Sequence, residues 1–185
     1  DLYDESPQLL NILDECEKAG RPNMVYIFSS TSKITYPGSG VAMIASSNAN
    51  IEHMKKQISV QTIGPDKLNQ LRHVRVFPNK AALLSQMRKH AEVLRPKFDA
   101  VLDILERDLA GKGIAEWSKP LGGYFISFDA MPGCANRIFH LCDEAGLALT
   151  KVGATFPYGN DPEDSNIRLA PSYPPIEELV IAMER

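Results

Sequence analysis

The chain alternates between short, wholly apolar runs and longer segments in which apolar residues recur every three or four positions. Runs of the first kind predict buried strands, and segments of the second kind predict amphipathic helices. Two apolar runs near the start, residues 24–28 and 41–45, lack alternation with polar residues and therefore predict buried strands. A polar loop from Ser29 to Gly40 separates them. Strands that alternate with helices are typical of an α/β protein.

The first helix is predicted from its capping signals. Ser6 followed by Pro7 provides a cap and a first-turn proline, and Gly20 ends the apolar repeat. The longest amphipathic pattern extends from Leu83 to Leu109, and Pro96 within it is expected to kink or break the helix. Such a long helix often links two domains. Further helices are predicted over residues 50–61, 67–75, 136–145 and about 176–183, and further strands over 114–117, 124–128, 147–149 and 167–170.

Composition and charge narrow the class of protein. Hydrophobic residues make up 44% and charged residues 23% of 185 residues, as in ordinary soluble globular proteins. The net charge of -3, without a concentrated basic face, argues against a nucleic-acid surface. No apolar run approaches the roughly 18 residues of a membrane helix, and the acidic start shows no signal peptide. The three cysteines, Cys16, Cys134 and Cys142, lack metal-type spacing, so we expect reduced thiols in a cytoplasmic protein and no metal site.

The two ends of the chain lead us to expect a fragment of a longer protein. The first residue is Asp1 rather than methionine, and an apolar helical repeat is still in progress where the chain stops at Arg185.

The loop Ser30-Thr31-Ser32-Lys33 carries the most specific candidate chemistry. An aldehyde cofactor is held through an imine to a lysine amine, which must be partly desolvated to be neutral near pH 7. Ser30 and Ser32 can donate hydrogen bonds to a phosphate, and Gly38 and Gly40 let the backbone approach a ligand. Taken alone, however, a lysine in such a loop is more often a solvated turn residue.

Two further motifs follow in order, Lys119-Pro120-Leu121-Gly122-Gly123-Tyr124-Phe125 and Asn166-Ile167-Arg168-Leu169-Ala170-Pro171-Ser172. Together with the lysine loop they resemble the C-terminal half of class I/II, fold-type-I aminotransferases, which depend on pyridoxal 5'-phosphate (PLP). The sequence of residues 30–42 is similar to that of a subgroup of MocR-type or aspartate-aminotransferase-like proteins. The resemblance covers nearly the whole chain.

The resemblance implies a role for each matching residue. Lys33 would hold the cofactor and, when released by the substrate, move a proton between the substrate Cα and the cofactor. Ser30 and Ser32 match positions at or near the cofactor phosphate. Arg168 would bind the substrate α-carboxylate with its planar guanidinium. From the residues alone, pairing of Arg168 with a nearby acid, namely Asp161, Glu163 or Asp164, is favoured.

One departure concerns the phosphate. Many members of the family carry an arginine about eight residues after the lysine, where this chain has Gly40-Val41. Either backbone amides replace that arginine, or another residue supplies the charge. The segment Thr62–Asn69 corresponds to one that approaches the neighbouring subunit's site in the family. The four histidines, His53, His73, His90 and His140, are assigned no chemistry because none forms a metal-type pair.

By the same resemblance, residues 1–85 form the end of a large PLP-binding domain with a mainly parallel sheet, and residues 86–185 a small C-terminal α/β domain. The expected function is transfer of an amino group between an amino acid and a 2-oxo acid, by a homodimer, with the fragment inactive alone. Two alternatives stay open. One is another fold-type-I reaction such as elimination or decarboxylation, and the other is an aminotransferase-like effector domain of a transcription regulator.

Overall fold

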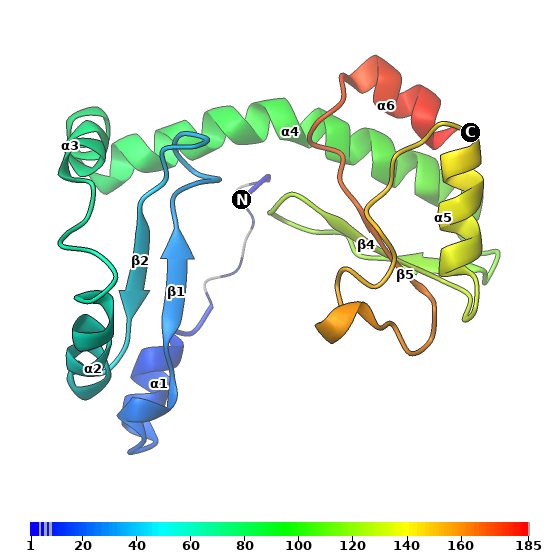
Figure 1. Cartoon of the computed structure of the whole chain (residues 1–185). Helices are drawn as coiled ribbons and strands as arrows, with labels where there is room; N and C mark the ends of the chain where they lie inside the picture. Colours follow the sequence, from blue (N-terminus) through cyan, green and yellow to red (C-terminus); the bar gives the residue numbers. More distant parts are fainter. Residues whose placement is uncertain (4, 6, 8, 185) are drawn as a thin grey trace. The chain divides into compact units, whose positions relative to one another are not determined.

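The structure, a computed structural model, describes residues 1–3, 5, 7 and 9–184. Its elements follow one another as labelled in Figure 1. The helices are α1 (Ile12–Lys18), α2 (Asn48–Ile58), α3 (Lys67–Val76), α4 (Lys80–Leu109), α5 (Ala135–Glu144) and α6 (Ile176–Met183), with short 3-10 turns at Pro22–Met24 and Pro157–Gly159. The strands are β1 (Ile27–Ser30), β2 (Ala42–Ala45), β3 (Ala115–Trp117), β4 (Ile126–Ala130) and β5 (Asn166–Leu169).

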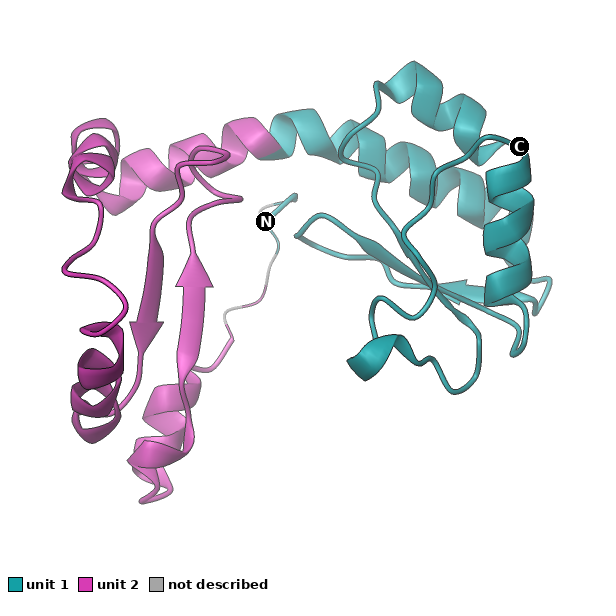
Figure 2. Ribbon diagram, viewed as in Figure 1, with its two compact units in different colours: residues 1–6, 91–185 teal, residues 7–90 magenta. Residues whose placement is uncertain are grey.

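The chain divides into two compact units (Figure 2). Unit 1 comprises Asp1–Ser6 and Ala91–Arg185, and unit 2 comprises Pro7–His90. The boundary between them falls within α4. These units differ from the expected division after residue 85 chiefly because the first residues of the chain pack with the C-terminal half.

Unit 1 is built on a three-stranded antiparallel sheet in the order β3-β4-β5. Trp117 pairs with Phe128, which in turn pairs with Ile167. Along β4 the residues Ile126, Phe128 and Ala130 are buried while those between them are exposed, as expected for a strand with one face on a core. The core of the protein therefore lies on this face of the sheet.

Helix α4 supplies the other side of that core. Ala91, Phe98, Val101 and Leu105 recur at helical spacing and are all buried. The helix is continuous from Lys80 to Leu109, so the break considered at Pro96 does not occur. Pro96 is exposed, and the packing of Phe98, which is fully buried, stabilises the helix across the position where proline removes a backbone hydrogen bond.

The start of the chain also belongs to this core. Leu2 is buried, its amide donates to the carbonyl of Leu121 at 2.8 Å, and its carbonyl accepts from Nε of Arg95 at 2.7 Å. The hydroxyl of Tyr3 donates to Oδ1 of Asp99 at 2.6 Å. Burial, followed by this hydrogen bond, raises the pKa of Tyr3 to about 12. Two residues of α4 therefore anchor the N-terminal segment.

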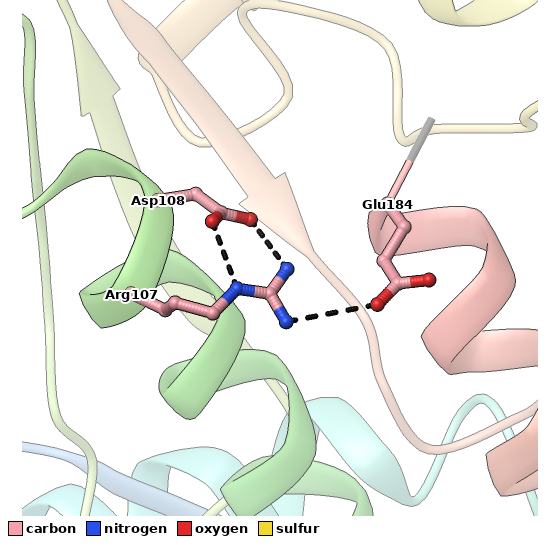
Figure 3. A network of polar contacts seen from close by, with 3 residues as sticks. All are labelled: Arg107, Asp108 and Glu184. Carbon is pink, nitrogen blue, oxygen red and sulfur yellow. Dashed lines mark hydrogen bonds and ion pairs between the residues drawn. The ribbon is translucent and has the colours of Figure 1, made fainter.

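A polar contact links the ends of α4 and α6 (Figure 3). Arg107 donates from Nε and Nη2 to the two carboxylate oxygens of Asp108, at 2.8 and 2.6 Å, and its Nη1 lies 3.6 Å from Oε1 of Glu184. The hydrogen bond from Arg107 lowers the pKa of Asp108. All three side chains are about half exposed, so this network contributes little to stability.

Unit 2 corrects the prediction of two buried strands. β1 and β2 form an antiparallel hairpin in which Ile27 lies opposite Ala45 and Ser30 opposite Ala42. Phe28 is 73% exposed and Met43 is 53% exposed. The first strand also begins later than expected, because residues 22–24 form a 3-10 turn. Apolar strands indicate that something covers them, but the two-stranded sheet of this unit leaves its faces open.

The two units differ in how far their hydrophobic side chains are buried. Among the residues that the structure describes, every buried hydrophobic side chain belongs to unit 1. The described strands pair only in the antiparallel sense, so the expected mainly parallel sheet is not formed by this segment itself.

Several other predictions are confirmed or corrected by the element bounds. The predicted helices 67–75 and 136–145 and the strand 167–170 are confirmed within about two residues at each end. The expected cap Ser6 lies outside the described residues, and α1 begins at Ile12 with Asn11 as its N-cap. No strand forms over residues 147–149, which are irregular. In the described part of the chain, no helix is both long and apolar enough to cross a membrane.

Candidate functional site

Lys33 lies in the middle of a single tight turn between β1 and β2. The amides of Ile34 and Thr35 both donate to the carbonyl of Thr31, at 2.9 and 2.8 Å. Residues 31–35, called here the Lys33 turn, therefore form one closed loop of backbone. Lys33 itself is exposed within this chain. A short and hydrogen-bonded turn restricts where the lysine Cα can lie.

Thr31 closes the Lys33 turn onto the next strand. Its amide donates to the carbonyl of Val41 at 2.9 Å, and its Oγ1 accepts from the amide of Val41 at 2.9 Å. At the other end of the turn, Thr35 is 3% exposed, and its amide donates to the carbonyl oxygen of Thr31 at 2.8 Å. Both ends of the turn are therefore held from within the loop.

Two serine hydroxyls lie together at the entry to the turn. Oγ of Ser30 and Oγ of Ser32 are 2.6 Å apart, and the amide of Ser32 donates to Oγ of Ser30 at 3.1 Å. Each hydroxyl carries one proton, and their mutual hydrogen bond uses one of the two. One hydroxyl proton therefore remains for an external acceptor. This arrangement fits the oxygen atoms of a phosphate group, which accept hydrogen bonds strongly.

Gly40 packs directly against these hydroxyls. A Cβ atom built on Gly40 would collide with Oγ of Ser32 and would lie 2.9 Å from its Cα. Because the second contact is with backbone, it could not be relieved by a side-chain rotation. A side chain at position 40 therefore does not fit without a shift of the backbone, which explains the glycine there.

Sequence reasoning missed the residues that hold the loop from α3. His73, which was assigned no chemistry, places Nε2 2.8 Å from Oγ1 of Thr35, and Asn69 donates from Nδ2 to the carbonyl of Ser39 at 2.8 Å. The only signal in the sequence is that Asn69 and His73 are four residues apart on a predicted helix, and therefore on one face. Nothing local pairs that face with the lysine loop.

Arg168 is on β5, opposite Ser127 of β4. Its guanidinium carbon lies 4.4 Å from the centroid of the Phe125 ring, within the range of a cation–π contact. Its Nε is buried and has no hydrogen-bond partner in the described part of the chain. A buried, unpaired guanidinium nitrogen costs free energy unless another group pairs with it. The arrangement therefore suits an anionic ligand.

Two of the three acids that could have paired with Arg168, Asp161 and Asp164, have other partners. Asp161 accepts from the amides of Ser165 and Asn166 at 2.9 and 2.8 Å, and these bonds, that from Asn166 foremost, lower its pKa. Asp164 accepts from the amide of Asn136 at 2.9 Å. Within the described residues, no ion pair joins Arg168 to Asp161, Glu163 or Asp164.

Arg168 also borders a polar network and a pocket. Asn166, two residues before it and nearly buried, donates to Ser127 and Asp129 at 2.9 and 2.7 Å and accepts from Thr155 at 2.7 Å. A mainly apolar pocket of about 610 Å³ lies between β5, α6 and residues 146–150, with Arg168 among its lining residues. Arg168 thus lies at the pocket, two residues from the hydrogen-bonded Asn166 on the same strand.

The structure brings Ser30, Ser32 and Lys33 together in unit 2 and places Arg168 in unit 1. Each of the two groups of candidate residues is therefore defined within its own unit. One group is a lysine turn with paired hydroxyls, and the other is an arginine stacked on an aromatic ring.

A lysine turn with phosphate-type donors and an arginine suited to a carboxylate, on α/β units, are the features expected of a chain of the aminotransferase class. Residues 1–185 match the family described as aspartate amino-transferase, and the chain belongs to this family. It is 48% identical over 183 residues to the aspartate aminotransferase of Corynebacterium glutamicum, covering 99% of this chain and 42% of that protein.

Solved structures of aminotransferases are similar to this chain. An aspartate transaminase from Corynebacterium glutamicum superposes with a TM-score of 0.94 at 48% identity, over 99% of this chain and 43% of that one. The α-aminoadipate aminotransferase LysN from Thermus thermophilus, complexed with N-(5'-phosphopyridoxyl)-L-leucine, is 21% identical with a TM-score of 0.76, over 98% of this chain and 45% of that one, and shows the shared fold. The chain spans less than half the length of these relatives.

Proposed function

We propose that this chain is part of a PLP-dependent aminotransferase that moves an amino group between an amino acid and a 2-oxo acid. The observation that carries the proposal is the Lys33 turn, where a lysine lies beside the paired hydroxyls of Ser30 and Ser32. When bound, PLP supplies an electron sink that stabilises negative charge at the substrate Cα. The relative at 48% identity is named for aspartate, so aspartate is the first substrate to test.

The residues of this chain have separate roles in the proposal. Ser30 and Ser32 donate a hydrogen bond to the phosphate. Lys33 holds the cofactor covalently through its Nζ and, when displaced by the substrate amine, carries the proton that leaves the substrate Cα. A lysine amine can do both because it is a nucleophile and a base once neutral.

Arg168 binds the substrate α-carboxylate in this proposal. Its Nε is buried and unpaired among the described residues, so a carboxylate oxygen would satisfy a donor that otherwise costs free energy. The Phe125 ring lies against the guanidinium and restricts its orientation. A fixed guanidinium plane favours two parallel hydrogen bonds to a carboxylate.

The exposed apolar strands of unit 2 support the domain assignment. Residues 1–85 would be the end of a large cofactor-binding domain and residues 86–185 a small domain. The side chains of β1 and β2 that are exposed here, such as Phe28 and Met43, would then be covered by the rest of the protein, which supplies the mainly parallel sheet. The intact protein would be a cytoplasmic homodimer of the MocR-type or aspartate-aminotransferase-like subgroup.

The test is amino-group transfer by the full-length protein from aspartate to a 2-oxo acid. Lys33→Ala abolishes turnover, whereas Lys112→Ala, which changes an exposed lysine far along the chain, does not. Arg168→Ala raises KM for the amino acid and leaves the absorption of the bound cofactor intact, with Arg137→Ala as the matched exposed control. Product formation without a 2-oxo acid would indicate a lyase. Turnover retained in Lys33→Ala would refute the proposal, and an unchanged KM in Arg168→Ala would refute the role of Arg168.

A further inference from the structure

We propose that Asn69 and His73 of α3 form a clamp that positions the Lys33 turn for the reaction. The inference rests on the proposed function, since it assigns a positioning role toward Lys33. The two residues, called here the α3 clamp, lie on one face of the helix. Each contacts a different part of the loop that carries the lysine.

His73 contacts both ends of the Lys33 turn. Its Nε2 is 2.8 Å from Oγ1 of Thr35 and 3.4 Å from Oγ1 of Thr31, the two residues that open and close the turn around Lys33. The Nε2 edge of the imidazole therefore lies close to the threonines at both ends of the turn. Because Thr35 is 3% exposed, solvent does not compete for this hydrogen bond.

The proton positions on His73 follow from its second contact. Nδ1 lies 2.9 Å from the carbonyl oxygen of Asn69, which can only accept, so Nδ1 carries the proton of the neutral ring. Nε2 is then the acceptor and faces the Thr35 hydroxyl. The carbonyl of the helix's own preceding turn thereby fixes which edge of the ring is presented to the Lys33 turn.

Aromatic packing fixes the plane of the ring. Tyr36 and Phe77 surround His73, with ring centroids 5.8 Å and 6.2 Å from it, and lie 5.6 Å from one another. Tyr36 comes directly after the turn and Phe77 directly after α3. The same contacts therefore join the end of the Lys33 turn to the end of the helix.

Asn69 holds the far side of the loop. Its Nδ2 lies 2.8 Å from the carbonyl of Ser39 and 3.3 Å from that of Gly40, the glycine that packs against Ser32. The α3 clamp thus fixes both the lysine turn and the segment that supports the serine hydroxyls. A base that is misplaced by a fraction of an ångström loses much of its catalytic effect, which is why such a clamp has a functional consequence.

The test uses paired variants of the full-length protein. Thr35→Val removes the hydroxyl and keeps the shape, whereas Thr35→Ser keeps the hydroxyl. His73→Phe keeps an aromatic ring without the hydrogen bond, whereas His73→Gln restores a polar group that can reach Thr35. His53→Phe is the control, because His53 is an exposed histidine on α2.

The readouts separate positioning from folding. We expect Thr35→Val and His73→Phe each to lower kcat about tenfold to a hundredfold, with KM for the amino acid changed less than about twofold. The pH midpoint of the absorption band of the bound cofactor shifts in the same two variants. Thr35→Ser and His73→Gln recover most of kcat. The double variant, Thr35→Val with His73→Phe, has a kcat within about twofold of that of either single variant, because both changes remove the same hydrogen bond.

Three outcomes would overturn the clamp. The first is a wild-type kcat and an unshifted spectral midpoint in both Thr35→Val and His73→Phe. The second is a double variant in which the two losses of kcat multiply. The third is a loss of kcat in His53→Phe as large as that in His73→Phe. Should His73→Phe not fold, Thr35→Val against Thr35→Ser carries the same test. Borohydride reduction of the wild-type holoenzyme distinguishes the two proposals. A missing adduct on Lys33 refutes the proposed function and the clamp with it, whereas an adduct on Lys33 with unaffected variants refutes the clamp alone.

Discussion

Gly40 and Ser32 approach so closely that a Cβ atom on residue 40 would lie 2.9 Å from the Cα of Ser32. The contact joins the two sides of the loop that carries Lys33, eight positions apart in the chain. It explains why residue 40 is a glycine, whereas the arginine that many members of the family carry would correspond to Val41. In the proposed function, the hydroxyls of this loop and groups elsewhere in the protein would bind the phosphate.

Substituting Gly40 tests this packing. Gly40→Ala should destabilise the full-length protein by about 1–3 kcal/mol, because the added methyl group meets backbone as well as a hydroxyl. PLP should also bind more weakly, since Ser32 must move. Gly64→Ala is a matched control, because a Cβ atom there has nothing within 4 Å. Urea unfolding and cofactor titration measure both effects, and equal behaviour of the two variants would contradict the packing argument.

Phe125 is expected to tune the substrate affinity of Arg168. Phe125→Leu keeps an apolar side chain but removes the ring face that lies 4.4 Å from the guanidinium carbon. Cation–π contacts contribute about 0.5–2 kcal/mol, so KM for the amino acid should rise roughly twofold to thirtyfold with kcat little changed. Tyr158→Asn, at a fully exposed aromatic residue, should leave KM as it is. An unchanged KM in Phe125→Leu would mean that the stacking does not orient Arg168.

Asp164 adopts a left-handed backbone conformation and also caps α5, and substitutions can separate these two contributions to stability. Its φ of 49° lies in the left-handed region, and its side chain accepts from the amide of Asn136 in the first turn of α5, where Cys134 provides no side-chain cap. Asp164→Ala should cost about 2–3 kcal/mol, roughly 1 from the lost cap and the remainder from the backbone conformation. Asp164→Gly should lose only the cap, and Asp164→Asn should lose least. The order of their urea midpoints checks this, and an Asp164→Gly protein less stable than Asp164→Ala would contradict it.

Tyr3 gives a pH-dependent prediction. Burial and the hydrogen bond to Asp99 raise its pKa from about 10 to about 12. A tyrosine whose pKa is higher in the folded than in the unfolded protein stabilises the fold fully at any pH below its unfolded-state pKa. That stabilisation is lost as the pH rises through the folded-state pKa. The stabilisation from Tyr3 should therefore be present below pH 10 and be lost toward pH 12.

Ultraviolet absorbance titration of tyrosine ionisation measures this. The difference between the wild-type protein and Tyr3→Phe should show one tyrosine with a pKa of about 12. Asp99→Asn should move that pKa part of the way back, since it removes a neighbouring negative charge while burial remains. A difference curve centred near pH 10 would show that the N-terminal segment does not dock on α4 in solution.

The sequence predicts the elements whose signals are local. The bounds of α3, α5 and β5 follow from apolar periodicity and from end signals such as Gly146, which has a φ of 81° after α5. The Lys33 loop was also recognisable, because its hydroxyls and glycines are contiguous in the chain. These features depend on residues within one or two turns of each other, so a linear pattern contains them.

Contacts between distant residues could not be predicted in this way. Thr35 and His73 are 38 positions apart, and neither residue type distinguishes a hydrogen-bonded clamp from an ordinary surface residue. The burial expected for residues 24–28 and 41–45 failed for a different reason. Within the described part of the chain these strands have open faces, and Phe28 is 73% exposed. In the proposed function, the rest of the large domain would cover them.

Mass spectrometry can identify the lysine that binds the cofactor in the full-length protein. The full-length holoenzyme is reduced with borohydride, digested, and searched for the peptide that carries the reduced phosphopyridoxyl group. The account predicts that this group is on Lys33, in the peptide that also contains Ser30 and Ser32. A modification on any other lysine, or none on a protein that has bound PLP, would contradict it.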